Sequence, residues 1–218
     1  MLPVGDRDHI QGPADAPATL VEYGDFECPN CRQAHPIVKR IQGRMGPRLR
    51  FAFRNFPLTE LHPHAQHAAE VAEAAGAQGK FWEMHDRLFQ RQFALDDEHL
   101  ITYAEELGLD SGRVARELAA RTYKGRVRDD FMSGVRSGVN GTPTFFINGV
   151  RHDQAWDEEG LAAALERAVA VKACPPPAAG SRAATSDGSA CFRDRSASSK
   201  AETAALCGRP WLGRASRS

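Results

Sequence analysis

Residues 22–31 read Glu-Tyr-Gly-Asp-Phe-Glu-Cys-Pro-Asn-Cys, and the interpretation of the whole chain depends on this stretch. It begins inside a short apolar run, residues 18–24, that is typical of a buried β-strand. After it, residues 32–45 place apolar side chains at helical spacing. Cys28 and Cys31 are therefore predicted at the junction between a strand and the helix that follows it.

Two thiols at such a junction suit thiol–disulfide exchange, which needs one thiolate to attack and a second thiol to resolve the mixed disulfide. The N-terminal end of a helix stabilises negative charge, so it lowers a thiol pKa from about 8.5 towards roughly 3.5–7. A spacing of three residues puts Cys31 one helical turn from Cys28, within disulfide reach. We therefore predict that Cys28 and Cys31 form a redox-active pair.

Two other interpretations of the cysteine pair stay open at this point. A structural zinc site would need two more ligands, and the sequence has no second Cys-x-x-Cys motif. His62, His64 and His67 make a site of two cysteines and two histidines conceivable. The pair could also be structural and chemically inert. The redox interpretation is favoured, and no metal is predicted.

The pattern around the motif predicts an α/β fold. Residues 49–54 alternate apolar and polar side chains, so strand, helix and strand form a βαβ unit with a right-handed crossover. Helical patterns fill about residues 62–139. β character then returns in a hairpin whose turn is Asn148-Gly149, and a last helix follows. The order is βαβ, an all-helical insertion, then ββα.

These patterns divide the 218 residues into three parts. Residues 1–17 form an N-terminal segment, and residues 18–172 form the domain. Residues 173–218 are basic, low in complexity and poor in large apolar side chains, which predicts a disordered tail. The three cysteines of this tail have no metal-like spacing and are taken as incidental: Cys174, Cys191 and Cys207.

The bulk composition narrows the partners and the location. A net charge of +0 gives no reason to expect nucleic acid or an anionic membrane surface as a partner. No apolar run approaches the roughly 20 residues that cross a bilayer. Residues 1–8 lack a basic region followed by an apolar stretch, so no signal peptide is expected and the predicted location is cytoplasmic.

Residues 22–31 also resemble the active-site segment of the DsbA family, within the thioredoxin superfamily. An acidic residue six positions before the first cysteine (Glu22) and a helix-kinking proline (Pro36) are similar to that family. Residues 141–144, Gly-Thr-Pro-Thr, resemble its cis-proline loop, and residues 79–85 resemble a recurrent segment of its helical insertion. The resemblance covers about residues 10–172 and is nearest to cytosolic or antiporter-fused bacterial members.

This resemblance implies a thioredoxin-like fold with a helical insertion of the DsbA type. It implies that Cys28 attacks, that Cys31 resolves, and that Glu22 shuttles a proton to or from Cys31. A cis bond before Pro143 would bring the Thr142 backbone to Cys28 and pair a substrate strand there. The implied substrate-binding residues are the following four: Phe26, Pro29, Asn30 and Thr142.

The sequence differs from the DsbA family at one position of the motif, and some residues near the motif are expected to have structural roles. Pro29-Asn30 stands where the strongly oxidising periplasmic enzyme has Pro-His, so one stabiliser of the thiolate is missing here. Trp82 and Met84 are expected in the core rather than along a groove, and His35 is expected as a solvated helix residue. No cofactor beyond the cysteine pair is expected. Candidate partners are protein or small thiol and disulfide substrates, glutathione, or a thioredoxin-type reductant.

Two other functions compete with a protein disulfide oxidoreductase. The first is a thioredoxin-fold chaperone or binding module whose cysteines are dispensable. The second is a glutathione-linked transferase or isomerase built on the same insertion architecture. Members of that last group usually keep a single serine or cysteine, so the presence of both Cys28 and Cys31 argues against it.

Overall fold

The structure, a computed structural model, describes residues 1–173. Its centre is a mixed five-stranded sheet in the order β1-β3-β2-β4-β5. The central pair β2 and β3 is parallel, and the other pairs are antiparallel, so the predicted βαβ unit and the predicted fold class are confirmed. The strands are β1 (His9–Gln11), β2 (Ala18–Gly24), β3 (Leu49–Asn55), β4 (Thr144–Ile147) and β5 (Val150–His152).

The edge strand β1 was not expected, because residues 1–17 were placed outside the domain. Three residues are too few to show a period in the sequence, yet they pair with β3 in register His9↔Phe53. Buried contacts also fasten this segment: the Arg54 guanidinium donates to both oxygens of Asp8, at 2.7 and 3.0 Å. The N-terminal segment is thus part of the folded domain.

The tight turn between β4 and β5 follows from its two residues. Asn148 and Gly149 both have positive φ angles, 47° and 86°, as a type I′ hairpin turn requires. Asn148 also accepts a hydrogen bond from the Thr19 backbone at 2.7 Å, which ties the turn to the start of β2. The predicted hairpin is therefore confirmed, and it fixes the register of the strand that carries the proline loop.

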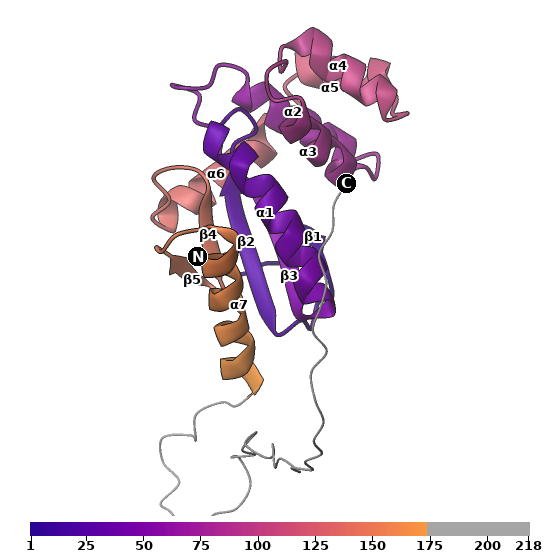
Figure 1. The fold of residues 1–218 in the computed structure, drawn as a ribbon. Helices are drawn as coiled ribbons and strands as arrows, with labels where there is room; N and C mark the ends of the chain where they lie inside the picture. The colour runs from indigo at the N-terminus through magenta and orange to yellow at the C-terminus, as the bar shows by residue number, and fades with distance from the viewer. Residues whose placement is uncertain (174–218) are drawn as a thin grey trace, which may run out of the picture. The chain divides into compact units, whose positions relative to one another are not determined.

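Seven helices and one short 3₁₀ turn complete the described residues (Figure 1). None of these helices combines the length and the apolar character that crossing a membrane requires. Their bounds are α1 (Pro29–Met45), the turn η1 (Gly46–Arg48), α2 (Ala65–Gly76), α3 (Phe81–Gln90), α4 (Asp97–Glu106), α5 (Ser111–Ala119), α6 (Lys124–Arg136) and α7 (Glu158–Ala173).

Helices cover both faces of the sheet. On one face, α1, α3 and α7 pack against Leu20 and Phe53 in the main core. On the other face, α6 stacks Phe131 on Phe56 with ring centroids 4.3 Å apart. A Cβ at Gly134 of α6 would lie 2.7 Å from the Phe56 ring, so only glycine permits this close approach.

This arrangement shortens the predicted helical insertion. Figure 1 shows α2 to α5 gathered towards one end of the sheet, with α3 also packed on the face that carries α1, whereas α6 lies against the second face. The helical pattern of residues 62–139 therefore combines two structural roles that periodicity does not distinguish. The insertion proper is α2 to α5.

Candidate active site

The two cysteines of the motif lie at the start of α1. Cys28 is the N-cap residue, with extended backbone angles, and Pro29 follows at the first helical position, where a missing N–H costs nothing. Cys31 lies on the face of α1 that packs into the core and is fully buried. The helix therefore begins three residues earlier than its apolar spacing indicated. Both cysteines are free thiols in this structure.

Cys28 lies in surroundings that favour its thiolate. The hydrogen bond from the Cys31 side chain is the largest cause, outweighing burial, and it is supported by Thr142 and by the backbone N–H groups of Asn30 and Cys31. Together these contacts lower the pKa of Cys28 to about 5. In its protonated form the Cys28 thiol donates to the Thr142 carbonyl oxygen, with the two atoms 3.3 Å apart, in a loop whose Thr142–Pro143 peptide bond is cis.

Cys31 has the opposite electrostatic character. Burial raises the pKa of its thiol well above the ordinary value, and the hydrogen bond to Cys28 and the nearby Glu22 carboxyl add to the effect. Its sulfur accepts one backbone hydrogen bond, from Asp25 at 3.5 Å. One thiol of the pair is thus ionised near neutral pH and the other is protonated, which is the division that attack and resolution require.

Glu22 lies on β2 behind the pair, opposite Phe53 and Phe145 in the neighbouring strands. Its side chain is buried, and burial together with the Cys28 charge raises its pKa to about 8. Its Oε1 has no hydrogen-bond partner among residues 1–173. A buried carboxyl that titrates near neutral pH can take up or release a proton beside Cys31.

Two polar side chains that were not among the predicted site residues, Asp25 and Gln92, hold the loop before Cys28. The Asp25 carboxylate accepts hydrogen bonds from the Leu58 backbone and from His62 Nδ1, both at 2.8 Å. Gln92 donates to the carbonyl oxygens of Phe26 and Cys28, at 2.8 and 2.9 Å. These contacts join residues that are distant in the sequence, so no local sequence motif predicts them.

The structure corrects the expectation that Phe26 binds substrate. Only 1% of Phe26 is exposed, and its ring packs against Phe53 and Phe89 inside the core. Apolar residues beside a reactive cysteine suggest a groove, but the turn between β2 and α1 directs this side chain inward. Pro29 and Asn30, in contrast, are exposed beside Cys28, where an approaching substrate would meet them.

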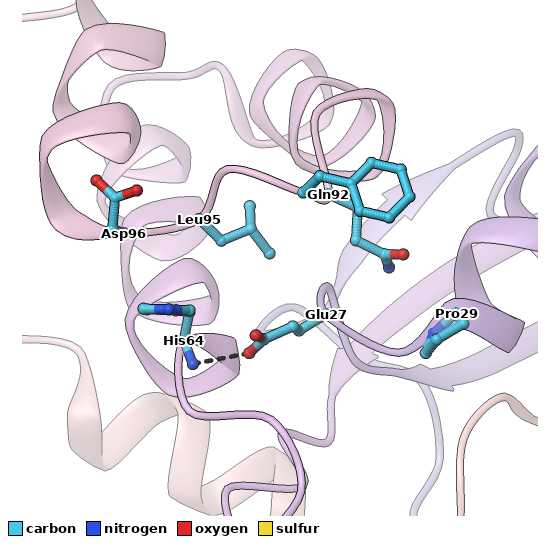
Figure 2. A pocket seen from close by; sticks show the side chains of 7 residues that line it. Glu27, Pro29, His64, Gln92, Leu95 and Asp96 are labelled. Carbon is cyan, nitrogen blue, oxygen red and sulfur yellow. Dashed lines mark hydrogen bonds between the residues drawn. The ribbon is translucent and has the colours of Figure 1, made fainter.

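A pocket of about 340 Å³ opens next to this dipeptide (Figure 2). Figure 2 shows Glu27 and Pro29 on one side and Gln92, Leu95 and Asp96 on the other, with His64 below. Glu27 is held by the His64 backbone N–H, which donates to its carboxylate at 2.7 Å. The pocket lies between the active-site loop and the helical insertion, and its volume suits one or two substrate side chains.

A second correction concerns His35, which was expected to be solvated. Its Nε2 lies 2.9 Å from Asp86, and Lys39 Nζ lies 2.6 Å from the other oxygen of the same carboxylate. His85 Nδ1 also bonds to Asp86, at 3.0 Å. These groups lie close together, but Lys39 already supplies the positive charge beside the carboxylate, so we interpret them as a hydrogen-bonded cluster and assign no metal.

The three histidines of the alternative zinc interpretation have other partners than the cysteines. His62 bonds to Asp25, and His67 Nδ1 bonds to Asp97 at 2.6 Å. The backbone N–H of His64 bonds to Glu27. Trp82 packs partly buried against the core and Met84 is fully buried, as expected.

The lowered pKa of Cys28 gives a direct prediction. We expect the rate of alkylation by iodoacetamide, followed by mass spectrometry of the Cys28 peptide, to rise through a midpoint near pH 5 and then stay level towards pH 8. The midpoint is the informative quantity, because a thiolate of low pKa is also a weaker nucleophile. The same peptide in the unfolded protein should titrate near about pH 8.5. A midpoint of that value in the folded protein would contradict the electrostatic account.

The fold and the site together define a class of protein. A thioredoxin fold, a helical insertion, two cysteines at the start of α1 and a cis-proline loop beside them are the features of DsbA-like thioredoxin-fold proteins. A family model described as Thioredoxin matches residues 5–167. The chain belongs to this family.

Solved structures agree with this fold. BdbD from Bacillus subtilis superimposes with a TM-score of 0.69 at 22% identity, covering 75% of this chain and 94% of that one. A thioredoxin-like oxidoreductase from Silicibacter pomeroyi gives a TM-score of 0.67 at 26% identity, covering 75% of this chain and 93% of that one.

Curated relatives are closer in sequence but much longer. The Na(+)/H(+) antiporter NhaA 1 of Salinispora arenicola is 50% identical over 171 residues, which cover 78% of this chain and 26% of the relative. NhaA 1 of Mycolicibacterium vanbaalenii is 42% identical over 163 residues, which cover 74% of this chain and 26% of the relative. The chain thus spans about a quarter of the length of these relatives.

Proposed function

We propose that this protein is a disulfide oxidoreductase that exchanges disulfides with protein substrates through Cys28 and Cys31. The observation that carries the proposal is the difference in protonation between the two thiols. One is held as a thiolate at the helix start, and its neighbour is buried and protonated. A binding module with dispensable cysteines has no need for this division, so the electrostatics favour the enzyme over a chaperone or adaptor.

The reaction follows from the site. The Cys28 thiolate attacks one sulfur of a substrate disulfide, and the other substrate sulfur leaves as a thiolate. Cys31 then loses its proton and attacks Cys28 Sγ, which forms the Cys28–Cys31 disulfide and releases the second substrate thiolate. Two electrons pass from the cysteine pair to the substrate. The reverse sequence oxidises a substrate dithiol.

The substrate would approach along the exposed Pro29-Asn30 dipeptide. Thr142 lies beside the sulfur on the opposite loop, so an extended substrate backbone there could pair with it as an added strand. Glutathione or a thioredoxin-type protein as the electron partner, and a cytoplasmic location, stay predictions. The antiporter names belong to the longer relatives, in which the matching segment would serve as a redox module.

Insulin reduction tests the proposal. The reduced protein should accelerate the precipitation of insulin chains in dithiothreitol well above the rate with dithiothreitol alone. Protein alkylated on its cysteines beforehand is the matched control and should give no acceleration. If the unmodified protein gave no acceleration and formed no Cys28–Cys31 disulfide in glutathione buffers, disulfide exchange would be excluded.

A further inference from the structure

A small cavity lies behind the active site, between α1, β2 and α3. Its volume, as space open to a water-sized sphere, is about 10 Å³, which is close to what one water molecule needs. Glu22 of β2 and His85 of α3 both line it, and His35 and Lys39 line its α1 side. The cavity is thus bounded by the carboxyl behind Cys31 and by the histidine cluster.

Two atoms of side chains that line this cavity have no hydrogen-bond partner among the described residues. They are Glu22 Oε1 and His85 Nε2, and both side chains are more than nine-tenths buried. A buried polar atom left without a partner costs about 1–3 kcal/mol, and native proteins satisfy most such atoms, often with an ordered water. A space of this size, lined by the two side chains that carry these atoms, is suited to one water that bridges them.

The donors and acceptors fit this bridge in one direction. His85 Nδ1 faces the Asp86 carboxylate at 3.0 Å, so the ring proton is on Nδ1 and Nε2 is an acceptor. Burial lowers the pKa of His85 to about 4, which agrees with a neutral ring. Burial holds Glu22 protonated near neutral pH, so its carboxyl is a donor. Glu22 can therefore donate to the water, and the water to His85.

We propose that His85, fixed by Asp86, and a water in this cavity form the proton path between Glu22 and the surface, so that His85 is a positioning residue for the resolving step. This inference rests on the proposed function. It gives a role to a buried histidine that the exchange of sulfur atoms does not itself require.

The proton balance of the resolving step is then complete. Once Cys28 is in the mixed disulfide, its charge no longer raises the pKa of Glu22. The ionised fraction of Glu22 then takes the proton of Cys31 as the Cys31 thiolate forms its bond to Cys28 Sγ and the substrate thiolate leaves. The carboxyl passes that proton to the water, which gives one to His85 Nε2. The His85 Nδ1 proton passes to the Asp86 carboxylate and from it to His35 Nε2, and the partly exposed His35 side chain releases a proton to solvent. In the opposite direction of exchange the same path delivers a proton to Cys31.

The titratable and charged groups around His85 determine how the rate of the resolving step depends on pH. On its own helix it meets Asp86, and from α1 it meets His35 and Lys39. From β2, Glu22 lines the same cavity as His85. From β3 it meets the uncharged ring of Phe53, with centroids 4.6 Å apart. Glu22 is thus the titrating group on the side of the cysteines.

Ellman's reagent separates the two sulfur steps in one experiment. The full chain with Cys174, Cys191 and Cys207 changed to serine is the common background. Attack by Cys28 releases the first thionitrobenzoate, and attack by Cys31 on the resulting mixed disulfide releases the second. In His85→Phe, which keeps an aromatic ring in an aromatic cluster, the first release should stay within about twofold of the parent. The second should slow by about tenfold or more.

Further variants separate a proton path from simple packing. His85→Gln keeps a polar group but cannot relay a proton through two ring nitrogens, and it should slow the second release as well. Glu22→Gln should slow it too, and adding His85→Phe to Glu22→Gln should have no further effect, because the path is already broken. Phe89→Leu, at a ring 5.0 Å from His85, is the packing control and should leave the second release unchanged.

The possible results are distinguishable. A second release at the parent rate in both His85 variants would overturn the inference, and so would equal slowing of both releases or an additive effect in the double variant. In each of these cases the exchange function stands. If the parent protein itself releases thionitrobenzoate no faster than an ordinary thiol and forms no disulfide, the proposed function fails instead.

Discussion

Replacing Cys28 with serine is expected to lower insulin reduction by at least about 10³-fold, because a hydroxyl does not ionise near neutral pH and the thiolate is the attacking group. The fold should persist, since serine has a similar size and Cys28 is an N-cap position, where serine is favoured. The measurement is the rate of insulin precipitation above the dithiothreitol background. Unchanged activity would place the chemistry elsewhere in the chain.

Cys31→Ser is the matched variant and should fail in a different way. Cys28 can still attack, because its thiolate keeps the support of the Thr142 side chain and the backbone N–H groups at the helix start. Resolution is blocked, so a mixed disulfide between Cys28 and the substrate should accumulate and be visible by mass spectrometry. Cys28→Ser should trap none. If both variants behaved alike, the assignment of attacking and resolving roles would be wrong.

Replacing Asp8 with alanine is expected to have the largest effect on stability. The Arg54 side chain is fully buried, and Asp8 neutralises it through two hydrogen bonds. Removing one partner of a buried ion pair typically costs about 3–5 kcal/mol, because the other charge is left uncompensated. Urea unfolding of the reduced protein measures the loss. The exposed Asp6→Ala, in the same segment, should change the free energy of unfolding by less than about 0.5 kcal/mol.

The same pair predicts the direction of a pH effect. Burial raises the pKa of Asp8, but hydrogen bonds from Arg54 and the Gly5 backbone outweigh it, and the net pKa lies below 3.8. The stabilisation is therefore fully present above pH 3.8 and is lost as the pH falls through the lowered value. Asp8→Ala should remove this part of the acid sensitivity. Equal losses of stability in Asp6→Ala and Asp8→Ala would contradict the buried-pair account.

Short-range chemistry made much of the fold predictable. The position of the cysteine pair between a strand and a helix was predictable, because the apolar pattern changes there from strand spacing to helical spacing. The turn at Asn148-Gly149 has the positive φ angles that these two residues adopt most easily. Where local pattern and tertiary packing agree, as in β2, α1 and the β4–β5 hairpin, the sequence was sufficient to predict the element.

The errors arose where distant segments meet. β1 is too short to show a period, and it depends on pairing with β3 and on the Arg54–Asp8 contact. α6 has the same helical signature as the insertion, but it packs on the sheet through Phe131. His35 has the spacing of a surface residue and becomes half-buried only because α3 brings Asp86 against it. None of these neighbours can be inferred from one-dimensional periodicity.

The chemistry of the site was predictable to the same degree. The nucleophile and its partner could be named from the sequence, because a three-residue spacing at a helix start has a physical meaning. The cavity between Glu22 and His85 could not, since it depends on how α1 and α3 are spaced from the sheet. Phe26 was misjudged for the same reason: adjacency to Cys28 along the chain does not fix the direction of its side chain.

The two hydrogen bonds of Gln92 have a consequence for the opening of the native structure. They connect the segment between α3 and α4 to the carbonyl groups on either side of Glu27, so the helical insertion cannot separate from the redox loop without exposing both oxygens. Amide hydrogens in these two regions should therefore exchange with deuterium as one cooperative unit. Any event that loosens the insertion will also loosen the loop that carries Cys28.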